Sequence, residues 1–91
     1  MDDRLAAAGL RLYPGWIGIH TQDQAAGALS NGTRVRKIKS EPGDTHPIGS
    51  LATVLGSLGL PDIGYGYFVE WDVKPRLAVF VIAAKIAAAG G

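Results

Sequence analysis

The chain has no cysteine among its 91 residues. No disulfide, thiol nucleophile or thiolate metal site is therefore open to it, which fits a reducing compartment. It also lacks a long apolar stretch, because the longest run, residues 77–84, is far shorter than the about 20 residues that a membrane-spanning helix needs. Asp2 and Asp3 stand where a secretory signal would carry positive charge. We therefore expect a cytoplasmic protein with no membrane partner.

Neither sign of charge is in clear excess, since 9 Lys and Arg face 8 Asp and Glu for a formal net charge of +1. This balance argues against strong non-specific binding of polyanions. The basic residues that do cluster are Arg34, Arg36, Lys37 and Lys39. They could contact phosphates, or they could form a solvated strand whose charges protect a sheet edge. Glu41 and Asp44, directly downstream, favour the second interpretation.

No catalytic or metal-binding constellation is visible. Asp44 and His46 share a loop and belong to residue types that bind metals or exchange protons, but His20 is far upstream and the spacing is not a metal signature. Ser50 and His46 make no credible nucleophile–base pair, and the glycine-rich segments lack the lysine of a phosphate loop. We expect no enzymatic activity, no metal and no other cofactor.

The clearest secondary-structure signal is an aromatic and β-branched run at residues 65–72, which predicts a strand. Side chains alternate across a strand. One face would then hold Tyr65, Tyr67, Val69 and Trp71, and the other Gly66, Phe68, Glu70 and Asp72. Burying the two carboxylates would be costly, so we expect the Tyr/Val/Trp face in the core. Phe68 would then lie on the outer face or under a loop.

Three further strands are expected at residues 33–39, 50–57 and 77–86. In the first, strict alternation would bury Lys37 and expose Ile38, so we expect a bulge near Arg36-Lys37 or an early end of the strand. Pro42-Gly43, in the loop at residues 40–49, suits a tight turn. The expected core consists of Val35, Val54, Val69, Trp71, Val79, Val81 and either Phe80 or Ile82.

The first thirty residues carry a weaker signal. Residues 21–32 are small and polar, and cannot bury enough apolar surface to offset their ordering entropy. We therefore expect a flexible extension at residues 1–31, a folded unit at residues 32–86 and a disordered tail at residues 87–91. The competing interpretation is that residues 16–19, with one tryptophan and two isoleucines, dock on the folded unit as an extra strand.

Three sequence segments carry a resemblance to a known fold. They are Gly32-Thr33-Arg34-Val35-Arg36, Gly49-Ser50-Leu51-Ala52-Thr53-Val54 and Tyr67-Phe68-Val69-Glu70-Trp71-Asp72, followed by the last apolar strand. Together they resemble the small SH3-like barrels, including KOW-type domains, over about residues 31–86. The resemblance implies an all-β antiparallel barrel of five or so short strands, one more than the pattern places. Closing the barrel would reduce exposed edges.

Such barrels bind nucleic acids, ribosomes or peptides, or assist larger complexes, so the fold alone does not choose a function. We expect an interaction module that binds a protein partner or acts as an accessory domain, as a monomer or weak homodimer. Its candidate binding residues are the aromatic ones, Tyr65, Tyr67, Phe68 and Trp71, although core packing is their simpler role. The alternative is a nucleic-acid- or ribosome-associated module that uses the basic residues of 34–39.

Overall fold

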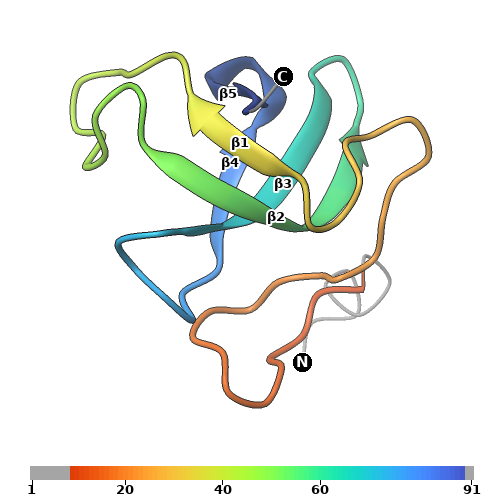
Figure 1. The fold of residues 1–91 in the computed structure, drawn as a ribbon. Helices are drawn as coiled ribbons and strands as arrows, with labels where there is room; N and C mark the ends of the chain where they lie inside the picture. Colours follow the sequence, from red (N-terminus) through yellow and green to blue (C-terminus); the bar gives the residue numbers. More distant parts are fainter. Residues whose placement is uncertain (1–8, 90–91) are drawn as a thin grey trace.

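A computed structural model describes residues 9–89 and contains a five-stranded antiparallel β-sheet (Figure 1). Its strands are β1 (Arg34–Lys37), β2 (Leu51–Leu60), β3 (Gly64–Trp71), β4 (Val79–Ile82) and β5 (Ile86–Ala88), with a 3-10 turn, η1 (Ala83–Lys85), between the last two. The strand order is β4-β3-β2-β1-β5. The predicted all-β antiparallel class is confirmed. Within residues 9–89 no helix has the length and apolar character needed to cross a membrane.

The sheet curls so that its two ends approach each other across a common core (Figure 1). The long strand β2 pairs with both β1 and β3, and a register shift between Val54 and Gly56 marks a bulge that helps it bend. Val79 and Val81 of β4 pack against the cluster that contains Val35 of β1. In the described residues β4 and β5 end the strand order and do not pair, so no ladder closes the predicted barrel.

The predicted strand at residues 77–86 is in fact two short strands separated by η1. Beyond the turn, β5 pairs with β1 through Val35↔Ala88 and Lys37↔Ile86, and Ala89 N–H donates to the Arg34 carbonyl over 2.7 Å. Residues 87–89 of the predicted disordered tail thus pair with β1 through their main chain, which argues against disorder there, although disorder in solution stays a prediction. Residues 90–91 of that tail lie outside the described residues.

The core forms on the predicted face of β3. Tyr67, Val69 and Trp71 are buried together, and the other buried members of this cluster are Val35, Ala52, Val54 and Ile86. Of the residues expected from β4, Val79 and Val81 are half-buried against this cluster. Phe80 is 43% exposed and lies on the opposite face of that strand, so it is not a core residue.

The outer face of β3 is covered by the amino-terminal segment. Phe68 points outward, as predicted, yet it is only 7% exposed. Its ring lies 6.2 Å from the ring of His20 and 5.3 Å from that of Phe80. His20 and Thr21 are themselves fully buried. From residue 9 onward, the predicted extension thus supplies a cover for an aromatic side chain of the sheet.

The rest of this segment runs along β2 and around the end of the sheet (Figure 1). Ser57 N–H donates to the Asp23 carbonyl and Ala25 N–H to Ser57 Oγ, each over 2.9 Å. The Tyr67 hydroxyl accepts from Leu29 N–H over 2.9 Å. These bonds explain how a polar linker can lie against the sheet. Groups of β2 and β3 satisfy the linker's main-chain hydrogen-bonding groups, and the linker's own composition does not reveal these partners. Flexibility of residues 1–31 in solution stays a prediction, and the contacts of residues 9–31 argue against it.

Candidate binding cavity

A cavity of about 350 Å³ lies between β4 and the loop at residues 38–50 that joins β1 to β2. It lies beside β4, the strand that ends one side of the sheet, and we call it the seam cavity. Its lining residues are Lys37, Glu41, residues 44–46, Trp71, residues 79–82 and Lys85. One wall is apolar and comes from β3 and β4, whereas the other is polar and comes from the loop, the end of β1 and η1.

Lys37 is the most deeply buried residue of the polar wall. The strand alternates strictly and ends at Lys37, without the bulge considered above, so Val35 and Lys37 point inward while Ile38 is 48% exposed. Lys37 is only 5% exposed. A buried ammonium group is tolerated when it is paired and hydrogen-bonded. Its Nζ donates to the His46 carbonyl over 2.6 Å and lies 3.2 Å from Asp44 Oδ2.

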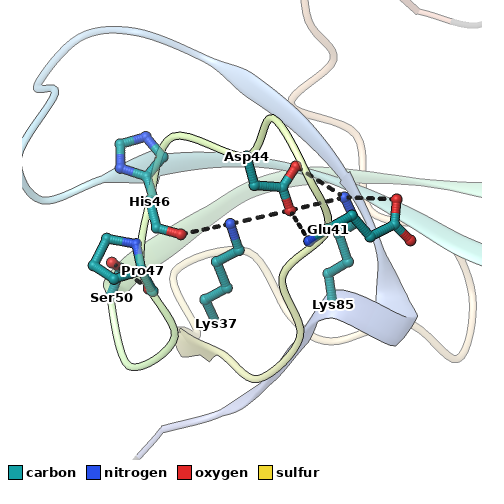
Figure 2. Close-up of polar contacts among 7 residues, drawn as sticks. All are labelled: Lys37, Glu41, Asp44, His46, Pro47, Ser50 and Lys85. Carbon is teal, nitrogen blue, oxygen red and sulfur yellow. Dashed lines mark hydrogen bonds and ion pairs between the residues drawn. The ribbon is translucent and has the colours of Figure 1, made fainter.

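Asp44 is the centre of the polar wall, between two ammonium groups (Figure 2). Its carboxylate lies 3.2 Å from Lys85 Nζ as well as from Lys37, and it accepts the Glu41 N–H over 3.0 Å. The bond from the Glu41 main chain, followed by that from Lys85, lowers the pKa of Asp44 to about 2. The carboxylate therefore stays ionised at neutral pH and ties the loop to both β1 and η1.

The loop has a defined shape around this carboxylate. Asp44 N–H donates to the Glu41 carbonyl over 3.0 Å, and Gly43 has a φ of 92°. This geometry confirms the tight turn predicted at Pro42-Gly43, because a positive φ at the third turn position favours glycine. Further along the loop, the His46 ring stacks on Trp71 with centroids 4.9 Å apart and planes at 27°. The loop is thus fixed at two points, through the ion pairs of Asp44 and through the stacking of His46 on Trp71.

The predicted basic cluster does not form one strip. Arg34 makes a two-pronged pair with Asp72, at 2.7 and 2.5 Å, and also donates to Thr53 Oγ1 over 2.8 Å. The guanidinium group lowers the pKa of Asp72. Lys37 points inward, so Arg36 and Lys39 are the two members left exposed without such a partner in the described residues.

The predicted aromatic residues separate in a similar way. The Tyr65 hydroxyl donates to the Ala26 carbonyl over 2.6 Å and the Tyr67 hydroxyl is also occupied, while Phe68 is covered on the outer face. Trp71 is 2% exposed and forms the back of the seam cavity. Of the eight candidate binding residues, Lys37 and Trp71 are the two that the structure brings together at this cavity.

The residues that sequence reasoning missed are Asp44, His46 and Lys85 as parts of one site. A signal for Asp44 did exist, because strict alternation buries Lys37 and a buried ammonium needs an acidic partner close by. Lys85 gave no such signal, since it comes from the far end of the chain and meets Asp44 only through the turn between β4 and β5.

Within the described residues, no group of three or more His, Asp or Glu side chains is arranged to hold a metal ion. The chain matches no family model, no curated protein and no solved structure. The chemistry of the seam cavity must therefore be judged from its own geometry.

Proposed function

We propose that the protein is a small, non-enzymatic interaction module that binds a segment of a protein partner in the seam cavity. The observation that carries the proposal is a cavity of about 350 Å³ with an apolar wall and a polar rim held by ion pairs. Ligand sites commonly measure about 300–1,000 Å³ and combine apolar walls with a few fixed polar groups. The small size suits a side chain or a short segment better than a large metabolite.

Binding fits the polar groups of this cavity better than catalysis does. A general base works best when its pKa is near the working pH. Asp44, with a pKa of about 2 and two lysine partners, is far from that condition. The His46 ring is stacked on Trp71, and its main-chain carbonyl is the acceptor for Lys37. These groups hold the loop in place and leave the apolar wall as the contact surface.

We also propose that the curled sheet is an SH3-like barrel left open at the seam. Its five antiparallel strands agree in number with that resemblance, and the two ends of the sheet face each other across the core. In this view the seam cavity is the position where a closed barrel would complete its wall. Cytoplasmic location and a monomeric or weakly dimeric state remain predictions.

The nucleic-acid alternative has less support, because Arg34 is neutralised by Asp72 and Lys37 is buried. It makes a distinct prediction, since affinity for generic RNA or DNA would fall steeply as salt rises. Binding with that salt dependence, lost on replacing Arg36 and Lys39 by glutamine, would favour the alternative over the proposal made here.

The proposal is tested by selecting binders from a random peptide library on the immobilised protein. The affinity of the best peptide is then measured by fluorescence polarisation for the wild type and two loop variants. Thr45→Phe places a large ring at the cavity lining and should weaken binding by about tenfold or more. Ile48→Phe, on the same loop but exposed and outside the lining, should leave affinity unchanged. Equal affinity in both variants, or no selected peptide, would contradict the proposal.

A further inference from the structure

The seam cavity runs along the edge of a strand. Four consecutive residues of β4, Val79–Ile82, line it. Because successive side chains point to opposite faces of a sheet, a cavity over one face would touch only alternate residues. Contact with all four places the cavity beside the strand. In the described part of the chain, β4 pairs with β3 on one side and ends the strand order on the other.

The main-chain groups that face this edge can be identified from a contact made by the chain itself. Ile17 N–H donates to the Arg76 carbonyl over 2.7 Å, and Ala78 N–H donates to the Ile17 carbonyl over 2.9 Å. Residue 78 therefore points its N–H away from β3. Since these groups alternate along a strand, Phe80 and Ile82 present their N–H and C=O groups to the same edge.

The amino-terminal segment uses the start of this edge and then leaves it. Gly18 has a φ of 96°, and a β-carbon at this position would lie 3.0 Å from the Ala78 carbonyl oxygen. The turn at Gly18 carries the chain onto the outer face, where His20 packs near Phe68. Pairing therefore stops at Ala78, although β4 continues to Ile82 with its edge facing the cavity.

We propose that an extended peptide strand from a protein partner continues this pairing. It hydrogen-bonds to the edge groups of Phe80 and Ile82 and inserts an uncharged aliphatic side chain into the seam cavity. Strand addition to a sheet edge gives affinity through the main chain and specificity through pockets for alternate side chains. The inference rests on the proposed function and specifies its ligand.

The charges at the cavity determine the side chain that it takes. Lys37 and Lys85 are balanced by Asp44 and Glu41, at distances of 3.2 to 3.8 Å. A charged ligand group would meet a like charge and compete with an existing pair, whereas an aliphatic group meets the Trp71 and β4 wall. A second copy's β4 is a poorer occupant than a free peptide strand, because the Ile17 contact and η1 flank the edge in both copies and leave only two facing residues on each.

One substitution removes an edge donor and leaves the sheet ladder intact. Ile82 has φ −81° and ψ 153°, which proline can adopt, and its N–H points away from β3. The preceding residue, Val81, is already in the extended conformation that proline requires. Ile82→Pro should therefore fold, and it should bind the library-selected peptide about two- to tenfold more weakly than Ile82→Ala, which keeps the N–H.

Two further readouts do not depend on that variant. Methylating each backbone nitrogen of the selected peptide in turn should weaken binding at alternate positions only. In the complex, amide hydrogen exchange should slow at Phe80 and Ile82. Val79 and Val81 serve as internal controls, because their amides face β3 in both states.

The outcomes separate this inference from the function on which it rests. Alternating sensitivity to methylation with protection of Phe80 and Ile82 supports strand addition. A peptide blocked by Thr45→Phe that shows neither pattern overturns strand addition and leaves a binding module. A failure to find any peptide sensitive to Thr45→Phe overturns both.

Discussion

The carbonyl oxygen of Thr21 occupies the space that a β-carbon on Gly56 would need. The amino-terminal segment therefore lies directly on the backbone of β2, and it can do so only because residue 56 has no side chain. The same contact brings the fully buried His20 and Thr21 over the outer face of the sheet. The main chain at Thr21 and Gln22 thus approaches the strand at a distance that a single methyl group would prevent.

Gly56→Ala should destabilise the protein by about 1–3 kcal/mol, because the methyl group displaces either the Thr21 main chain or the strand. The matched control is Gly59→Ala in the same strand, where a β-carbon meets nothing within 4 Å. This control should be neutral or slightly stabilising, since alanine loses less entropy on folding. Urea unfolding of the three proteins measures both effects, and equal stabilities would show that the segment does not rest on β2.

Deleting residues 1–31 should lower the free energy of unfolding by about 2 kcal/mol or more. The deletion exposes the ring of Phe68 and removes the Leu29 N–H that donates to the Tyr67 hydroxyl. Deleting residues 1–8 alone keeps every contact described above and serves as the control. Thermal unfolding followed by circular dichroism compares the two. If the longer deletion melts with the same midpoint and cooperativity as the shorter one, the segment is the flexible extension that its composition predicts.

Val69→Ala should destabilise by about 1–3 kcal/mol, through lost burial and a residual cavity, because Val69 is fully buried on the core face of β3. Val73→Ala removes the same atoms from a residue that is 71% exposed, just beyond the strand, and should change stability little. Chemical denaturation gives the two differences. A cost at Val73 equal to that at Val69 would contradict the assigned core face.

Asp44 should make stability depend on pH in the acid range. Its pKa is about 2 in the folded protein and 3.8 ordinarily, so its contribution is present above about pH 4 and is lost as the pH falls toward 2. Asp44→Asn should flatten that part of the stability curve. Asp62→Asn, exposed and outside the ion pairs of the described residues, should not. The lowered pKa of Asp72 also makes stability fall at acid pH, and it does so equally in all three proteins. Parallel wild-type and Asp44→Asn curves would exclude the ion-pair role.

The parts of the fold that sequence could predict are those whose signal is local. Alternation at β3, together with the cost of burying Glu70 and Asp72, assigned Val69 and Trp71 to the core and Phe68 to the outer face. Alternation also pointed to a buried Lys37. Of the two alternatives that would have avoided this, the bulge does not form and the strand does end early, at Lys37, yet Lys37 is still buried because Asp44 pairs with it. An apolar run does not show where it is interrupted, so the turn at η1 and the strand β5 were merged with β4 or left out.

The parts that could not be predicted depend on contacts between distant segments. The linker's composition gives no hint that Ser57, Tyr65 and Tyr67 would pair its main chain. The seam cavity likewise arises from Lys85 and a loop that come together only when the sheet curls. Trp71 was a candidate binding residue, but its role as a cavity wall required the position of β4.

The central claim is that ligand binds in the seam cavity, and the two tryptophans allow a direct test. Trp71 lines that cavity, whereas Trp16 lies on the amino-terminal segment beside Arg76. In an amide and indole NMR titration with the library-selected peptide, the indole N–H signal of Trp71 should shift and saturate while that of Trp16 stays in place. A saturating shift of Trp16 with Trp71 unmoved would place the ligand elsewhere and contradict the account.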